Sequence, residues 1–118
     1  NKWNFVDTNG KLISNIWFDR VDIFYDGYAR VNLYGKCNLI DKNGKCISDT
    51  WFDWVDDFED GYTTVKSGNK WNFVDTNGKL ISNTWFDWVD DFEDGYTTVR
   101  LNDKFFKIDK NGQRVSGM

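Results

Sequence analysis

The residues of this chain that could do chemistry are chiefly carboxylates, and they occur in runs. One acidic pattern is found twice, at Asp56, Asp57, Glu59 and Asp60 and again at Asp90, Asp91, Glu93 and Asp94. Such runs would offer oxygen ligands to calcium, but their spacing differs from that of an EF-hand loop. At the matching place earlier in the chain, Ile23 and Tyr25 replace two of the acidic residues. We therefore interpret the runs as solvated loops that oppose edge-to-edge strand pairing.

Other catalytic signatures are scarce. The 118 residues contain no His, no Gly-x-Ser-x-Gly motif, no phosphate-binding loop and no Cys or His set at metal-binding spacing. A glycosidase needs only two carboxylates, but every carboxylate pair here recurs along the chain. A catalytic site is normally one asymmetric cluster with perturbed pKa values. We expect no enzymatic activity and no cofactor.

Trp54 and Trp88 are the candidate ligand-binding residues. Arg20 occupies the equivalent position earlier in the chain, and a position that accepts a guanidinium is expected to be solvated. Two exposed indoles would stack on sugar rings or on apolar side chains of a partner protein. The alternative is that Trp and Arg both lie flat on neighbouring aromatic rings for packing alone. A second set of Trp residues never varies and is predicted to lie in the core: Trp17, Trp51 and Trp85.

These residues belong to a repeat with a period of 34 residues. KWNFVDTNGKLIS begins at Lys2, KCNLIDKNGKCIS at Lys36, KWNFVDTNGKLIS at Lys70 and KFFKIDKNGQRVS at Lys104. We predict one repeat domain over residues 1–118, consisting of units 1–34, 35–68 and 69–102 and a half unit 103–118. Because residue 1 is Asn and falls inside a repeat, we expect the chain to be a piece of a larger protein.

Each unit is predicted to be a three-stranded antiparallel meander, with strands at about 28–33, 36–41 and 45–48 in its complete form. Four Asn-Gly pairs predict two-residue turns in which both residues have positive φ: Asn9-Gly10, Asn43-Gly44, Asn77-Gly78 and Asn111-Gly112. Further hairpins are predicted at Tyr34-Gly35, Gly68-Asn69 and Asn102-Asp103. The segment from Trp17 to Gly27 permits either a fourth short strand or an aromatic-rich loop.

The position of the first turn predicts which side chains share a face of the sheet. Val6 would face Ile13 on one side, and Trp3, Phe5 and Leu12 would share the other. Both faces are then apolar and must be covered on both sides. We therefore expect the units to stack as an open array, solenoid-like or a partial propeller, because fewer than four complete units cannot close a propeller.

The terminal half unit fits this arrangement. Lys107 and Arg114 replace Phe5 and Leu12, which would place two charges on one face. We interpret that face as the end of the array, where no further unit follows.

Cys37 and Cys46 are the two cysteines. In the predicted register they share a face but lie about 13 Å apart, at ~3.4 Å per residue along adjacent strands. A disulfide needs Cα atoms within roughly 7 Å. Both are therefore expected to be free thiols that act as small apolar side chains.

Taken together, the KW opening, the aliphatic-Asp-x-x-Gly-Lys hairpin, the aromatic-Asp-x-Val core and the F-x-x-G-Y-x-x-V close resemble the WG-containing repeat family of bacterial and phage proteins. The resemblance covers nearly all of the chain. It implies a β-rich tandem repeat that is often a module of larger proteins, and it transfers no catalytic residue. One departure is consistent: the Gly expected after Trp is replaced by Asn4, Asn38 and Asn72, and by Phe106 in the final copy.

Charge and hydropathy narrow the range of partners. Fifteen basic and nineteen acidic residues give a net charge of −4, which disfavours nucleic acid and anionic membranes. No apolar run approaches the ~18 residues of a membrane span. We expect a non-catalytic structural or protein-interaction module that binds a protein partner or self-associates through an open strand edge at its first hairpin. The alternative is glycan binding through Trp54 and Trp88.

Overall fold

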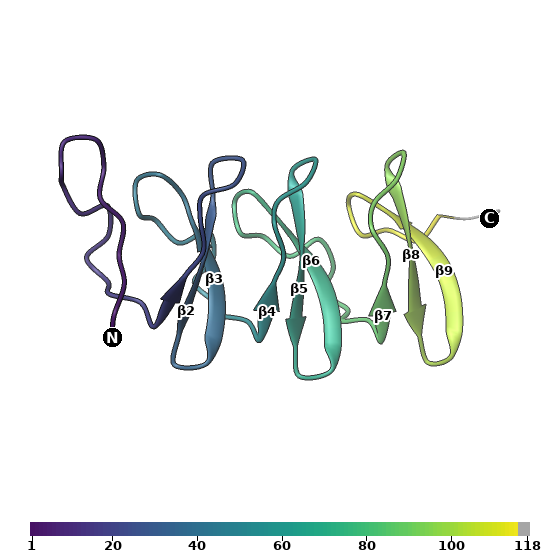
Figure 1. The fold of residues 1–118 in the computed structure, drawn as a ribbon. Helices are drawn as coiled ribbons and strands as arrows, with labels where there is room; N and C mark the ends of the chain where they lie inside the picture. Colours follow the sequence, from purple (N-terminus) through teal and green to yellow (C-terminus); the bar gives the residue numbers. More distant parts are fainter. Residues whose placement is uncertain (116–118) are drawn as a thin grey trace.

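The computed structural model describes residues 1–115 and is drawn in Figure 1. These residues contain nine strands and no helix, and so no helix that would cross a membrane. The all-β prediction is confirmed, and the strands form three separate antiparallel sheets of three strands each. They are β1 (Arg20–Val21), β2 (Ala29–Leu33), β3 (Lys36–Ile40), β4 (Trp54–Val55), β5 (Tyr62–Ser67), β6 (Lys70–Asp75), β7 (Trp88–Val89), β8 (Tyr96–Leu101) and β9 (Lys104–Asp109). The end of the predicted half unit, residues 116–118, lies outside the described part.

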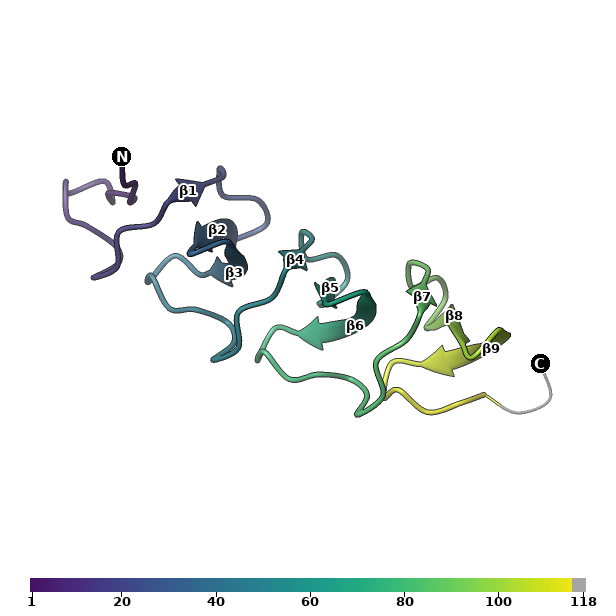
Figure 2. The ribbon, with the colours of Figure 1, turned by 90° about the horizontal axis from the view of Figure 1, so that it is seen from below.

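The sheets follow one another along a single axis, with the first hairpin at one end of the molecule and the third sheet at the other (Figures 1 and 2). The molecule measures 54 × 26 × 18 Å. In each sheet the strand order follows the chain, β1-β2-β3, β4-β5-β6 and β7-β8-β9. The prediction of an open array of stacked repeats is therefore confirmed.

The hairpins that join the two longer strands of each sheet form where the sequence predicts them. Leu33 pairs with Lys36 across the first of these turns. Tyr34 and Gly35 within it have φ values of 54° and 78°, as a two-residue turn of this type requires. Asn102-Asp103 forms the equivalent turn in the third sheet, with φ values of 53° and 67°.

The Asn-Gly turns are wider than predicted. Asp7 N–H donates to Lys11 O at 2.8 Å and Gly10 N–H donates to Asp7 O at 3.0 Å, so three residues separate the last paired positions. Among the described residues, Gly has a positive φ in each Asn-Gly pair and Asn does not. The cause lies in the preceding Asp: the Asp7 carboxylate accepts the N–H groups of Asn9 and Lys11 and stabilises the wider loop. The prediction of two-residue Asn-Gly turns was wrong.

This extra residue shifts the hairpin register by one position. Val6 bridges to Leu12 and not to Ile13, and Ile13 N–H donates to Phe5 O. The predicted face assignment was therefore wrong, because a one-residue slip moves side chains to the opposite face. The equivalent residues of the next hairpin follow the corrected register: Ile40 and Cys46 pack into one apolar cluster, and Leu39 and Ile47 into the next.

Two further predictions rested on the predicted register and are corrected with it. Lys107 and Arg114 lie on opposite faces, so only Lys107 belongs to the outer face of the last hairpin; Ile108, on its inner face, is 1% exposed. Cys37 and Cys46 also lie on opposite faces. Both are free thiols, as expected.

The third strand of each sheet comes from the segment between Trp17 and Gly27 and its equivalents in the later repeats, so the short-strand alternative for this segment is confirmed, with the strand as the third of its sheet and not a fourth. Residues 45–48 form no strand, and Cys46 makes an isolated bridge to Ile40. Instead the segment between Trp17 and Gly27 supplies the two-residue strand β1, and its equivalents in the later repeats supply β4 and β7. These short strands pair with β2, β5 and β8. The chain leaves the hairpin because side chains satisfy its backbone: Asn38 Nδ2 donates to Ser48 O at 2.9 Å.

The core lies between successive units, not within any one of them. Val31 and Ile40 of the first sheet pack towards Phe5 and Ile13 of the first hairpin, whereas Leu39 packs with residues of the second sheet. Each inner sheet is therefore covered on both faces, as expected for stacked repeats.

The invariant Trp residues cover this core instead of lying inside it. The fully buried positions are one residue further along, at Phe18, Phe52 and Phe86. Trp51 stacks over Phe18 of the preceding unit, with 6.4 Å between ring centroids. Trp17 lies before the first sheet and is 50% exposed. The prediction that these Trp residues form the core is corrected accordingly.

Candidate functional site

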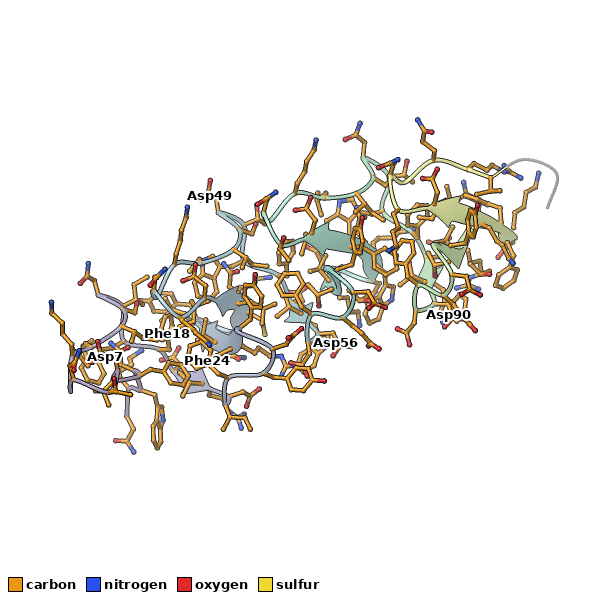
Figure 3. All side chains as sticks on the ribbon, turned by 90° about the horizontal axis from the view of Figure 1, so that it is seen from above. Asp7, Phe18, Phe24, Asp49, Asp56 and Asp90 are labelled. Atoms are coloured by element: carbon orange, nitrogen blue, oxygen red, sulfur yellow. The ribbon has the colours of Figure 1, made fainter. Side chains whose placement is uncertain are left out.

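The two candidate binding residues occupy the same place in consecutive sheets. Trp54 begins β4 and Trp88 begins β7. Their exposed fractions are nearly equal, 42% and 41%. Asp56 and Asp90, two residues beyond each Trp, lie along one long side of the array, and Asp49 lies on the opposite side (Figure 3). The exposed indoles and the acidic runs thus occupy neighbouring positions in the second and third sheets.

Trp54 is covered by a cation from the preceding sheet. The guanidinium of Arg30, in β2, lies 4.5 Å from the centre of the Trp54 ring. Its Nε donates to Val55 O at 2.9 Å. The same guanidinium donates to Asp22 at 2.5 Å and to Asp57 at 3.5 Å. With only 14% of its side chain exposed, Arg30 joins the first and second sheets through one group.

Trp88 has different surroundings, although its own sequence neighbourhood matches that of Trp54. Thr64 stands where Arg30 stands one repeat earlier. The Trp88 and Phe105 rings form an edge-to-face pair, with 6.1 Å between centroids. Beside it is a cleft of about 200 Å³ between the second and third sheets. Its lining residues are Asp56, Thr64, Trp71, Trp88, Val89, Asp90 and Asp91.

Trp71 gives this cleft a second indole. It pairs with Lys66 across β5 and β6, and the Lys66 Nζ lies 5.2 Å from the Trp71 ring centre. In the first sheet the same position holds Cys37, whose thiol lies 3.7 Å from Asp53 O. The surroundings of Trp88 are therefore more aromatic than those of Trp54, and Thr64 stands there in place of the guanidinium that lies over Trp54.

Most of the shifted pKa values belong to a Lys–Asp pair that recurs once per sheet. A hydrogen bond from Lys70 and another from the Asn102 backbone N–H hold the pKa of Asp87 below its usual value. Asp53 and Asp19 show the same lowering, with Lys36 and Lys2 as partners. Each of these Asp carboxylates accepts a hydrogen bond from a backbone N–H in the turn between the two longer strands of its sheet. For Asp87 the donor is the Asn102 N–H, at 2.9 Å.

The remaining shifts concern the cysteines and follow from burial. Desolvation raises the pKa of both thiols, Cys37 and Cys46, which lowers their reactivity as nucleophiles. Within residues 1–115 no group of three or more His, Cys, Asp or Glu residues is arranged to hold a metal ion.

Sequence reasoning identified the two Trp positions but missed Arg30 and Thr64. Arg30 has a signal in the sequence: its position reads Arg, Thr and Thr in three successive repeats, next to residues that hardly change. The acidic runs were interpreted as solvated loops. In the structure Asp57 is partly engaged, because it accepts a hydrogen bond from the Arg30 side chain.

The comparison with protein families agrees with this architecture. A family model described as WG containing repeat matches residues 3–37, 39–71 and 73–105. Searches of curated proteins and of solved structures gave no significant match. The three matched segments follow one another in step with the repeats and cover most of the chain. The chain therefore belongs to the WG containing repeat family.

Proposed function

We propose that this chain is a non-catalytic interaction module that binds a partner protein along one side of its array. The observation that carries the proposal is the repeated exposure of Trp54 and Trp88, each more than 40% exposed and each followed by acidic residues. Contacts of this kind are individually weak, but two of them at fixed spacing add by multivalency. Exposed Trp residues are also the side chains that most often dominate binding energy in protein interfaces.

The distribution of ionisable groups supports a non-catalytic role. The carboxylates with lowered pKa values, Asp19, Asp53 and Asp87, are each hydrogen-bonded to a Lys and to a hairpin backbone N–H. They explain how the linking hairpins are held, and they recur once per sheet. An active site would be expected to concentrate such groups in one asymmetric cluster.

The test is a binding assay with a panel of synthetic peptides of basic, acidic and apolar composition. We expect at least one class to bind saturably, and to lose most of its affinity in the Trp54→Ala/Trp88→Ala double variant. Trp17→Ala is the matched control, since Trp17 is also half exposed but lies before the first sheet. Peptide binding that survives in the double variant would contradict the proposal.

Glycan binding is the second candidate, favoured by the two indoles, Trp71 and Trp88, that line one cleft. Sugar rings stack on such surfaces through their apolar faces. Titration of the Trp fluorescence with an oligosaccharide panel distinguishes the two functions. Saturable quenching that disappears in the double variant would support glycan binding, and a flat response across the panel favours the protein partner.

We also propose self-association through the first hairpin. Val6 and Leu12 are 64% and 48% exposed, whereas the equivalent residues Val74 and Leu80 pack into an inter-sheet cluster. In the described residues no sheet covers this face of the hairpin. Light scattering at micromolar concentration should show a mass above that of the monomer, and Val6→Lys should reduce it. A monomeric mass for the unmodified protein would exclude this contact.

A further inference from the structure

We propose that the cleft beside Trp88 is a binding site for a guanidinium group, namely an Arg side chain of the partner protein. The inference rests on the proposed function and specifies its chemistry. The protein itself contains the template, because Arg30 binds at the equivalent place one repeat earlier.

Each residue that the Arg30 guanidinium contacts has an equivalent at the second place. The Arg30 guanidinium group contacts five residues: Trp54, Val55, Asp22, Asp56 and Asp57. One period of 34 residues further on, these positions are Trp88, Val89, Asp56, Asp90 and Asp91. All five of the latter line the cleft. The indole, the backbone segment and the three carboxylates that bind Arg30 are therefore repeated around it.

The cation itself is what the second place lacks. Thr64 replaces Arg30 in the chain, and its short neutral side chain forms part of the cleft wall. Among the salt bridges of residues 1–115, none involves Asp90 or Asp91, while their equivalents Asp56 and Asp57 both approach Arg30. A guanidinium from another molecule would restore the missing charge.

The shape and composition of the cleft favour Arg over other cations. A planar guanidinium stacks on an indole and donates to carboxylates in its plane at the same time. Trp71, in the place of Cys37, adds a second ring to the lining of the cleft, and the Lys66 Nζ lies 5.2 Å from the centre of that ring. A Lys ammonium is a compact and strongly hydrated charge, so it gains less than a guanidinium from stacking on the Trp88 indole.

The direct test follows the indole N–H signals by NMR while N-acetyl-L-argininamide is added. N-acetyl-L-citrullinamide, which is neutral and almost isosteric, is the control ligand. We expect the Trp88 and Trp71 signals to shift saturably with the Arg compound. The affinity for the citrulline compound should be weaker by a factor of at least about ten. Equal shifts with both compounds, or no shift with either, would overturn the proposal.

Substitution at residue 64 tests the site from the side of the protein. Thr64→Arg should place an internal guanidinium over Trp88, as Arg30 does over Trp54, and abolish the response to the Arg compound. Thr76→Arg is the matched control. It makes the same change of charge in an exposed turn where the equivalent repeats already carry Lys42 and Lys110. A Thr64→Arg protein that still binds like the unmodified one would contradict the inference.

The reverse change should create a second site. Arg30→Thr removes the internal cation from Trp54, so the Trp54 signal should then respond to the Arg compound and the stoichiometry should rise from one to two. Circular dichroism checks that this variant keeps its fold. If the Arg30→Thr protein folds and its Trp54 indole signal does not shift with the Arg compound, the correspondence between the two places does not reflect guanidinium binding.

The two levels of the proposal fail in different ways. If the Arg compound does not bind but peptides still bind through Trp54 and Trp88, the guanidinium site is refuted and the interaction module stands. If the Arg compound binds and no peptide does, the cleft recognises the group and the proposed function is wrong.

Discussion

Residues 1–15 and 69–83 have the same sequence but different surroundings. Val6 is 64% exposed in the first copy and Val74 is fully buried in the second. The same local bridges form in both, Val6 to Leu12 and Val74 to Leu80. The sequence therefore produces the hairpin, and the neighbouring sheet decides whether its inner face is buried. This is the behaviour expected of a stacked array, in which each unit contacts only its neighbours.

The turn glycines show the same contrast more sharply. A Cβ atom added to Gly78 would lie 1.7 Å from Ile47 O, a backbone atom of the preceding unit. One added to Gly10 would meet nothing within 4 Å. Gly78 serves both the positive φ of the turn and the close approach of two units, whereas Gly10 serves only the first purpose.

The largest predicted effect comes from Ala substitution at these two glycines. Gly78→Ala should destabilise the protein by about 3 kcal/mol or more, because overpacking against rigid backbone is added to the strain of a positive φ. Gly10→Ala should cost only about 1 kcal/mol, from the φ strain alone. Urea denaturation followed by Trp fluorescence measures both. Equal losses for the two variants would mean that the units do not stack as described.

The next effect concerns the inner face of the hairpin. Val74→Ala should cost about 2 kcal/mol, because it leaves a cavity between the first and second sheets. Val6→Ala should change the free energy of unfolding by less than about 0.5 kcal/mol. A large loss for Val6→Ala would indicate that this face is covered in solution, which also supports self-association. Repeating the urea experiment at two protein concentrations tests for self-association, because only a self-associated protein becomes more stable at the higher concentration.

A smaller difference is expected for the Asn residues that replace the family's Gly. Asn72 is fully buried; its Nδ2 donates to Ser82 O at 2.9 Å and its Oδ1 accepts the Phe73 N–H at 2.8 Å. Asn72→Ala should cost about 2 kcal/mol, since buried backbone groups lose their partners. Asn4 makes equivalent bonds in a half-buried setting, where water can replace them. Asn4→Ala should therefore cost about half as much, as measured by thermal unfolding.

No difference between the first and the later copies is expected at the Lys–Asp pairs, which lie at the surface in every unit. The pKa values of Asp19 and Asp87 are both lowered in the folded protein by hydrogen bonds from a Lys and a backbone N–H. Their contribution to stability is therefore present above the unfolded pKa and is lost as the pH falls below about 4. Asp19→Asn and Asp87→Asn should each flatten this acid dependence by a similar small amount. A marked difference between them in unfolding experiments from pH 3 to pH 6 would show that position in the array matters even at the surface.

Some features of the fold were predictable because they depend on short stretches of chain. The constant period, the turns at Tyr34-Gly35 and Asn102-Asp103 and the β content all follow from local preferences. The Asn-Gly turns were mispredicted since a side chain, that of Asp7, competes with the turn preference of the pair. That error moved the register by one residue and with it the assignment of faces.

The candidate site likewise contains residues that the sequence identified and a contact that it could not predict. Trp54 and Trp88 were found because Arg20 marks their position as solvated. Arg30 could not be connected to Trp54 from the sequence, because the two residues lie in different sheets and meet only when the sheets stack.

The sequence by itself determined that the protein is a β-rich array with a period of 34 residues and two exposed indoles at equivalent positions, because these properties repeat locally. The tertiary structure decided which face of each hairpin is buried, which strand completes each sheet, and which of the two indoles is covered by a cation. These outcomes depend on contacts between units, and such contacts are set by the relative placement of whole sheets, which no single repeat encodes.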